Sequence, residues 1–475
     1  MIGYRLFNLD LAGFIHDEPL MLTAAGRQLE TGEWLSASPL VGNLGVRYGP
    51  SVFWFYGGVQ LLFGPGAATS TLAMGLLLTG AHVALAAALS RAFRGGWLLF
   101  ATLLAWIASS PYQFFWSRLA WDQLANVSAS LALVILARAK FGWERAALLG
   151  IVLGLGLSSH LMIVPFAAVV LLVLVIEHRR SLSALTSGPG AVVLALVLVN
   201  LPYLLTLLKN PPPPVPFTGF SGSAFLGQMV GPARVNTHWG IDYFFDGAWG
   251  DFRSWLGGLS FLSVGGRVLV LVSIALSLLG LVMGLRSGED RRRRIALIGI
   301  LTWLSYAIFY AFRPLGPHPH YQFPTWWVVP AGLAAAVAWA RLRRPRLAPV
   351  LLSIVWGVAL FQFAFIVSWM SYVDARDGTQ GIHYATPIAA QEAIVREACS
   401  FPEANISLKN ETVLFPYSLD YLARTTQACD AKRVTICPPQ PCGGRGGNDR
   451  LLTLRYARPR GGALHLDGCG GRSTP

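Results

Sequence analysis

The sequence predicts an all-α polytopic membrane protein, with about ten transmembrane helices, followed by a small extracytoplasmic α/β domain at the C-terminus. Of the 475 residues, 54% are hydrophobic and only 13% are charged, which is more apolar surface than a soluble core of this length buries. Long apolar runs recur along the chain, and short basic clusters separate them. Because of this clustering, the net charge of +14 indicates membrane orientation and argues against nucleic-acid binding.

The apolar runs give the number of spans. Eight runs are each long enough to cross a bilayer once: 69–90, 96–113, 120–138, 189–208, 266–286, 294–312, 323–340 and 347–372. The run 146–176 is too long for one span, and the polar Ser158-Ser159-His160 at its centre favours a tight turn between two. We therefore predict about ten transmembrane helices.

Charge in the connections between spans predicts the orientation. Alternate connections are rich in arginine, which marks the cytoplasmic side of a membrane. The opposite, extracytoplasmic face then receives a first outer loop (12–68), a large outer loop (209–265) and the tail. We predict two domains, a transmembrane domain at 1–373 and an extracytoplasmic domain at 374–475.

Cysteine usage supports this orientation, since all five cysteines lie in the tail, where an oxidising compartment is expected: Cys399, Cys429, Cys437, Cys442 and Cys469. At most two bridges form within one chain, and their pairing is open. Short β-like stretches at Thr412–Phe415 and Leu451–Tyr456 favour an α/β-type domain, which we expect to pack over the outer mouth of the membrane part.

The N-terminal part holds two segments that are too short to span a membrane. Met1–Leu11 is too short and too polar for a signal peptide or a span, so we expect a further transmembrane helix upstream in the natural chain. A translocated N-terminus is the alternative. Val52–Phe63 is apolar but too short to span, which favours an interfacial helix.

Three acids in the outer segments are candidates for catalysis. Asp17 and Glu18 are adjacent in the first outer loop, and paired carboxylates suit acid–base work. The alternative is that they only cap a helix beginning near Pro19. Asp122 is the third acid, in a short outer turn. Its alternative is a salt bridge with Arg118.

Six motifs lie in the outer segments and at the ends of spans: Arg5-Leu6-Phe7-Asn8-Leu9-Asp10, His16-Asp17-Glu18-Pro19, Arg47-Tyr48-Gly49-Pro50, Leu62-Phe63-Gly64, Ser117-Arg118-Leu119-Ala120-Trp121-Asp122 and Gly378-Thr379-Gln380-Gly381-Ile382-His383-Tyr384. Together they resemble motifs of GT-C glycosyltransferases, in the branch of protein O-mannosyltransferases and lipid A aminoarabinose transferases. The resemblance covers most of the membrane part and little of the tail.

The resemblance implies a GT-C-like fold and a reaction. A sugar is transferred from a polyprenyl-phosphate carrier to an acceptor hydroxyl of a lipid, glycan or protein, usually with inversion. Asp17 is implied as the catalytic acid of the first loop, Glu18 as its motif partner and Asp122 as the second acid. A carboxylate would act as base on the acceptor, and cationic or hydrogen-bonding groups would receive the departing phosphate.

Candidate ligands of the donor phosphate share a place on the outer face: Arg47, Arg118, Arg313, His318 and His320. Arg313 is preferred because it lies at the outer end of a span. The alternative for each is an interfacial anchor. His318-Pro319-His320, together with Asp17 or Asp122, is a candidate site for a divalent ion. No cofactor is otherwise indicated.

Other functions fit the same topology. A secondary transporter or flippase of a sugar or lipid-linked saccharide would place ionisable residues and broken helices near the midplane, usually with an internal repeat. A polymerase or ligase of lipid-linked oligosaccharides would share the donor and the topology. A noncatalytic assembly protein would not need Asp17 or Asp122.

Overall fold

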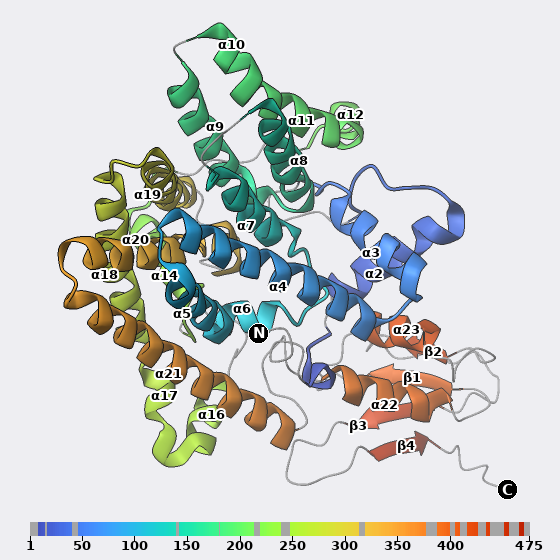
Figure 1. The fold of residues 1–475 in the computed structure, drawn as a ribbon. Helices are drawn as coiled ribbons and strands as arrows, with labels where there is room; N and C mark the ends of the chain where they lie inside the picture. The colour runs from blue at the N-terminus through green and yellow to red at the C-terminus, as the bar shows by residue number, and fades with distance from the viewer. Residues whose placement is uncertain are drawn as a thin grey trace, which may run out of the picture.

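The computed structural model describes most of the membrane part and separate segments of the tail. The described residues are 8–14, 17–39, 46–138, 142–179, 181–212, 219–238, 248–312, 319–376, 387–399, 404–408, 416–425, 434–437, 451–455 and 465–469. Helices build nearly all of the described residues up to 376, and strands appear only beyond them (Figure 1).

Among the described residues, seven helical segments are long and apolar enough to cross a membrane. They are α4 (Ala67–Ala92), η2 with α9 (Leu161–His178), α10 to α11 (Leu182–Val199), α18 (Gly266–Leu285), α19 (Asp290–Ala311), η6 with α20 (Tyr321–Arg343) and α21 (Leu347–Ala375). The other predicted spans are shorter helices, α5 (Gly96–Ser109), α7 (Leu124–Leu136) and α8 (Trp143–Ser159). The multi-pass membrane class is confirmed, and the count of ten spans stays a prediction.

Prolines and a polar turn explain where helices are shorter than predicted. α5 ends at Ser109 because Pro111 begins the short helix α6 (Pro111–Trp116). The chain then turns through residues 117–123, so α7 begins only at Leu124. The predicted run 189–208 divides in the same way, into α11 (Ala191–Val199) and α12 (Leu201–Lys209), with Pro202 in the first turn of α12.

Close backbone contact fixes α20 in the middle of the bundle, where most of it is buried. A Cβ atom at Gly280 of α18 would lie 1.7 Å from the carbonyl oxygen of Gly332 in α20. Ser277 lies at the same crossing, 2.6 Å from a Cβ at Gly332. Only small residues allow two membrane helices to approach this closely.

The first outer loop folds as two crossed helices, α2 (Asp17–Thr31) and α3 (Ser51–Phe63). The Gln28 amide of α2 donates a hydrogen bond to the Phe53 carbonyl of α3 at 3.1 Å. The Gln60 amide of α3 donates to the Leu22 carbonyl of α2 at 2.9 Å. The helix predicted over Val52–Phe63 is therefore confirmed, and its partner is α2.

Short helices build the described part of the large outer loop: α13 (Gly222–Met229), α14 (Gly231–Arg234), α16 (Ala248–Leu256), η5 (Gly257–Leu259) and α17 (Phe261–Val264). Asn236, which follows α14, is fully buried. Its amide donates to the Trp326 carbonyl at 2.7 Å and accepts from the Trp106 indole at 3.0 Å. This part of the loop is thus anchored in the bundle.

The tail contains both helices and strands: α22 (Ile388–Cys399), β1 (Ala404–Leu408), α23 (Pro416–Thr425), β2 (Val434–Cys437), β3 (Leu451–Arg455) and β4 (His465–Cys469). The strand order is β2-β1-β3-β4, with β1 parallel to β2 and β3, and β4 antiparallel to β3. Ile406 pairs with Ile436 and Leu452. The strand predicted over Leu451–Tyr456 is confirmed as β3, while Thr412–Phe415 lies outside the described residues. The extent of the domain stays a prediction.

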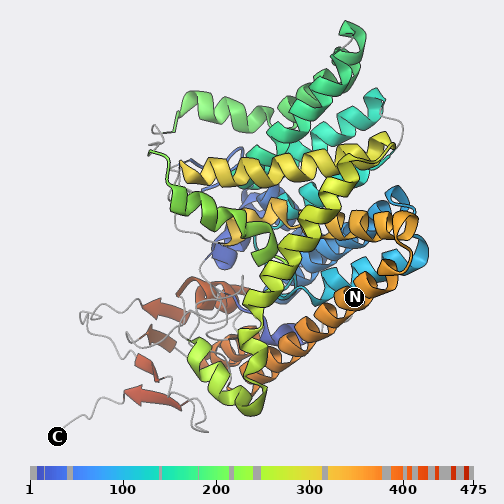
Figure 2. The same cartoon turned by 90° about the vertical axis from the view of Figure 1, so that its left-hand side faces the viewer.

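The tail packs on the first outer loop, as Figures 1 and 2 show for α22 and α23. The Ile388 amide donates to the Ala12 carbonyl at 2.9 Å, and the Gln391 side chain donates to the Phe14 carbonyl at 3.0 Å. Phe14 also contacts Tyr421 of α23, with 5.6 Å between ring centroids. The short segment before α2 therefore joins the tail to the bundle.

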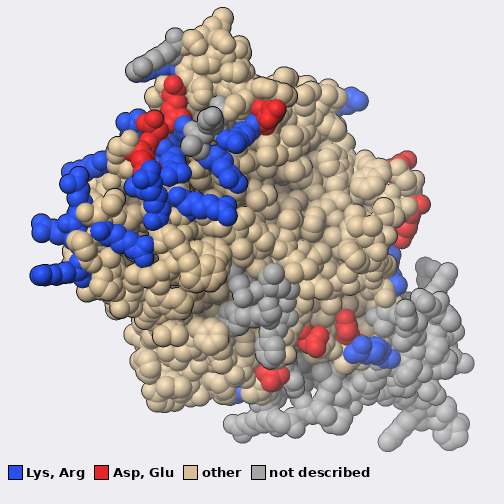
Figure 3. Space-filling view, viewed as in Figure 1, with Lys and Arg blue, Asp and Glu red and all other residues tan. Residues whose placement is uncertain are grey.

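Basic connections meet at one end of the bundle, which we call the basic end (Figure 3, upper left). Arg292 of α19 donates to the Ala92 carbonyl at 3.0 Å. Arg294 pairs with Glu177 at 2.8 Å, and Arg341 donates to the Gly95 carbonyl at 2.7 Å. These contacts thus link the ends of helices at four connections that were all predicted on one face of the membrane. The first residues of α7 and the last residues of α8 lie at the opposite helix ends.

Candidate active site

Asp17 and Glu18 form the first turn of α2, and the helix start predicted near Pro19 is confirmed at Asp17. Carboxylates are favoured in this position because the N-terminus of a helix is electropositive. Glu18 is fully buried, whereas Asp17 is half-buried. Burial and the Glu18 charge raise the pKa of the Tyr56 phenol, whose hydroxyl donates to the Trp121 carbonyl at 2.8 Å. Glu18 therefore lies close to α3 and to the turn that carries Asp122.

Asp122 is buried at the end of the turn between α6 and α7. Its side chain is 10% exposed, and its backbone carbonyl accepts a hydrogen bond from the Ser159 hydroxyl at 3.1 Å. Burial, and then the negative charge of Asp17, raise the pKa of Asp122 to about 8. The two predicted acids thus lie close enough to act on each other, and Asp122 keeps its proton near neutral pH.

His160 faces Asp122 from the turn between α8 and α9. The backbone N–H of Met162 donates to Nδ1 of His160 at 3.0 Å, so Nδ1 carries no proton. The proton of the neutral ring is therefore on Nε2, which lies 3.7 Å from Oδ2 of Asp122. Burial lowers the pKa of His160 to about 3. The contact accordingly joins two neutral groups near pH 7 and is not an ion pair.

Tyr48 covers the His160 ring. The two rings are stacked, with 4.6 Å between centroids and 29° between planes. Burial raises the pKa of the Tyr48 phenol, and the charges of Asp122 and Asp17 add to the effect. Tyr321 of η6 also contacts the His160 ring, with 5.9 Å between the ring centroids. Four segments distant in sequence therefore meet around Asp122.

The Tyr48 segment is held by the end of α8. The Ser51 N–H donates to the Ser158 hydroxyl at 3.1 Å, and the Ser51 hydroxyl donates to the Leu155 carbonyl at 2.9 Å. A Cβ atom at Gly49 would lie 2.4 Å from the Ser158 hydroxyl and 2.8 Å from its Cα. Glycine is needed here because two backbones touch, and this contact aligns Tyr48 with His160.

The candidate phosphate ligands lie in different environments. Arg47 is exposed, and its carbonyl accepts from the Tyr203 hydroxyl at 2.6 Å. Arg118 is fully buried, with its guanidinium 5.2 Å from the Phe114 ring centroid and hydrogen-bonded to the Asn8 carbonyl. Arg313 and His318 lie outside the described residues, as does 378–384. For His320 only the backbone, within η6 (Pro319–Thr325), is described.

The described residues offer no group of three or more His, Cys, Asp or Glu side chains that could hold a metal ion. Asp17, Asp122 and His160 therefore do not form a complete ligand set among themselves. The candidate ion site with His318 stays a prediction, because His318 lies outside the described residues.

Sequence reasoning missed two members of the site. Ser158-Ser159-His160 was recognised as a polar break between spans, but the same polarity inside a long apolar run also marks a buried functional group. Tyr48 lies in the motif Arg47-Tyr48-Gly49-Pro50, in which only Arg47 was predicted to be a site residue. Aromatic stacking on a distant histidine has no signal in a single sequence.

Comparison with known proteins shows which solved structures share this fold. No family model and no curated protein sequence matches the chain. The crystal structure of ArnT from Cupriavidus metallidurans in the apo state matches with a TM-score of 0.53 and 13% identity, over 91% of this chain and 87% of that one. The structure of ArnT bound to undecaprenyl phosphate matches with a TM-score of 0.54 and 14% identity, over 95% and 91%. The resemblance in the sequence motifs is thus confirmed for the fold: this chain has the fold of ArnT.

Proposed function

We propose that the protein is a GT-C glycosyltransferase that moves a sugar from a polyprenyl-phosphate-linked donor to an acceptor hydroxyl, with inversion, on the extracytoplasmic side. The observation that carries the proposal is the convergence of Asp17, Asp122, His160 and Tyr48 away from the basic end. The binding of undecaprenyl phosphate by an ArnT of the same fold supports the donor class.

The two acids have different roles in this mechanism, because a negative Asp17 disfavours a second charge on Asp122. The Asp17 carboxylate accepts the proton of the acceptor hydroxyl as its oxygen attacks the anomeric carbon. The bond from that carbon to the phosphate oxygen breaks. Protonated Asp122 then donates a hydrogen bond to a developing negative oxygen, while the neutral His160 ring, 3.7 Å away, places no second charge beside it. Glu18 stays the partner of Asp17 at the start of α2.

Cationic side chains complete the proposed site. We propose that the departing phosphate is bound by the candidate ligands predicted from the sequence: Arg47, Arg118, Arg313, His318 and His320. The exposed Arg47 directly precedes Tyr48, so it is the first to test among them. Guanidinium groups suit this role because they bind phosphate oxygens in pairs.

Asp17→Asn tests the proposal. Removing a general base costs about 10²–10⁴-fold in rate, so we expect at least a hundredfold loss of sugar transfer. The measurement uses membranes that contain the variant and a panel of radiolabelled undecaprenyl-phosphate sugars, and follows donor consumption. Native mass spectrometry with undecaprenyl phosphate should show unchanged binding, because Asp17 acts on the acceptor.

Glu30→Gln is the matched control, because Glu30 lies in the same helix with an exposed side chain. It should transfer sugar at the wild-type rate. Normal transfer by Asp17→Asn would contradict the proposal. Counterflow of labelled sugar through proteoliposomes that contain no lipid-linked donor would instead support a transporter.

A further inference from the structure

Three turns are locked together at the basic end of the bundle. Arg292, in the first turn of α19, donates to the Ala92 carbonyl at 3.0 Å, and Arg341 near the end of α20 donates to the Gly95 carbonyl at 2.7 Å. These contacts join the connection between α4 and α5, the connection between α18 and α19, and the last turn of α20. The ends of four membrane helices are therefore held in fixed positions.

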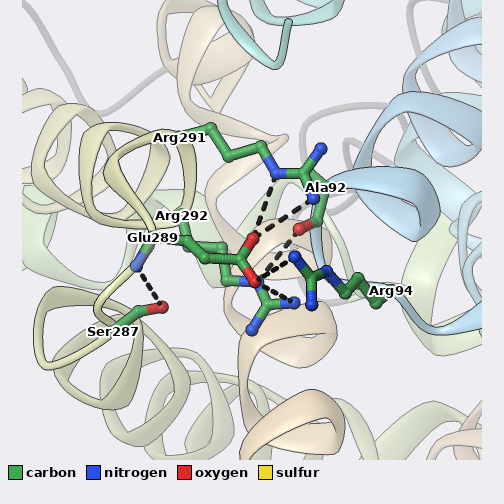
Figure 4. A network of polar contacts seen from close by, with 6 residues as sticks. All are labelled: Ala92, Arg94, Ser287, Glu289, Arg291 and Arg292. Carbon is green, nitrogen blue, oxygen red and sulfur yellow. Dashed lines mark hydrogen bonds and ion pairs between the residues drawn. The ribbon is translucent and has the colours of Figure 1, made fainter. Parts of the chain in front are cut away.

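One acid lies among several arginines in these turns. Oε1 of Glu289 lies 3.1 Å from Arg94 and 3.2 Å from Arg292, and Oε2 lies 3.2 Å from Arg291 (Figure 4). A single carboxylate thus faces three guanidinium groups. Positive charge remains in excess at this point, and the Glu289 contacts hold the side chains in place before any ligand arrives.

A cavity of about 420 Å³ opens beside this network. Its charged lining includes Arg286, Arg292 and Arg343 together with Glu289. Arg286 and Arg343 are exposed and, among the described residues, neither has a carboxylate within 4.0 Å. The cavity can therefore accept an anion without breaking an existing ion pair.

Large apolar side chains also line the cavity. Phe93, Met283, Trp339 and Leu342 contribute to the same cavity, and Leu342 is 70% exposed. These residues lie at the ends of helices that cross the membrane, where lipid headgroups give way to acyl chains. The lining thus combines groups that suit a phosphate with groups that suit a hydrocarbon chain.

We infer that this cavity binds the phosphodiester headgroup of an anionic phospholipid, with the phosphate on Arg286 and Arg343 and an acyl chain along Trp339 and Leu342. Basic residues that serve only to orient helices need neither a cavity nor an apolar wall. A free phosphate would leave the apolar wall unused. The inference is independent of the catalytic proposal, because the cavity lies at the basic end and the acids lie at the other.

Lipid selectivity of the wild-type chain gives the first test. The full-length protein in detergent is titrated with phosphatidylglycerol, with phosphatidylcholine and with glycerol 3-phosphate, and binding is measured by native mass spectrometry. We expect binding of phosphatidylglycerol to be at least tenfold tighter than that of phosphatidylcholine. Glycerol 3-phosphate should not compete. Equal binding of the two lipids, or competition by glycerol 3-phosphate, would overturn the inference.

A double variant locates the site. Arg286→Gln with Arg343→Gln should weaken phosphatidylglycerol binding by about 30-fold, since each arginine near an anionic headgroup contributes about fivefold. The matched control is Arg293→Gln with Arg346→Gln, two exposed arginines of the same end that do not line the cavity. An equal loss in the control would show a diffuse charge effect and contradict a defined site. Tryptophan fluorescence on heating confirms that both double variants are folded.

Discussion

At the scale of single residues, the environment of Asp122 decides what this carboxyl can do. It is buried, it feels the charge of Asp17, and its neighbour His160 presents an N–H at 3.7 Å. A carboxyl group kept neutral in this way donates hydrogen bonds and does not act as a base. In the proposed mechanism, the proton-accepting role is therefore assigned to Asp17.

The pH profile of transfer tests this division of roles. Transfer should fall as the pH rises through about 8, because Asp122 then loses the proton that it donates in a hydrogen bond. Asp122→Asn keeps a hydrogen-bond donor that does not titrate. We expect this variant to retain activity within about tenfold and to lose the alkaline decline. A rate that rises through pH 8 in the wild type, together with an inactive Asp122→Asn, would reverse the two roles.

Stability should respond to the same substitution. The pKa of Asp122 rises from 3.8 in the unfolded chain to about 8 in the folded one, so the folded state binds this proton more tightly. Stability contributed by the group is lost as the pH rises from about 4 to 8, and the loss is complete above 8. Asp122→Asn removes this loss and should stabilise the fold at pH 9 by up to about 6 kcal/mol.

The measurement is the apparent Tm in detergent, followed by tryptophan fluorescence at pH 5 and pH 9. The increase in Tm of Asp122→Asn over the wild type should be larger at pH 9 than at pH 5. Glu30→Gln, with its exposed side chain, should give the same small difference at both pH values. A gain that does not depend on pH would mean that Asp122 is not held neutral.

At the scale of elements, the contact between the Tyr48 segment and the end of α8 builds the site. Neither element contains a catalytic acid, yet their contact places Tyr48 on His160 and closes the site beside Asp122. The sequence predicted the α3 helix and the turn at His160 separately. Their contact depends on two backbones touching at Gly49, which hydropathy cannot reveal.

Gly49→Ala should therefore disturb both stability and activity. The added methyl would overlap the backbone of Ser158, and such overpacking costs about 1–3 kcal/mol. We expect a lower Tm and a loss of transfer, because Tyr48 moves away from His160. Gly58→Ala in α3 is the control, since its Cβ meets no atom within 4 Å and alanine favours a helix by about 0.5–1 kcal/mol. If both variants behaved alike, the Gly49 contact would have no special role.

At the scale of the whole molecule, the two ends of the bundle differ in chemistry. At one end, arginines contact the Ala92 and Gly95 carbonyls and the Glu177 carboxylate. The candidate catalytic acids and His160 lie at the other end. Charge of this kind sets the orientation of membrane proteins, with the basic end in the cytoplasm. The tail packs against the segment before α2 and is therefore expected outside.

Cysteine labelling tests this orientation. In a background whose five native cysteines are replaced by serine, Trp34→Cys and Gly288→Cys are exposed reporters of opposite ends. A membrane-impermeant maleimide should label Trp34→Cys in intact cells, and Gly288→Cys only after lysis. Both should react in detergent, which controls for reactivity. The reverse pattern would place the acids in the cytoplasm.

The sequence by itself determined the membrane class, the positions of most helices and the clustering of basic residues. It also identified Asp17 and Asp122 as candidate catalytic acids. These are local properties, since hydropathy, charge and proline breaks act on the segment that contains them. Only the tertiary structure decided that His160 and Tyr48 belong with Asp122, that Arg118 is buried against Asn8, and that the basic turns enclose a cavity. Those features depend on which helix ends meet. Small residues such as Gly49, Gly280 and Gly332 allow close contacts between segments that are far apart in the chain, and a single sequence does not reveal which segments these are.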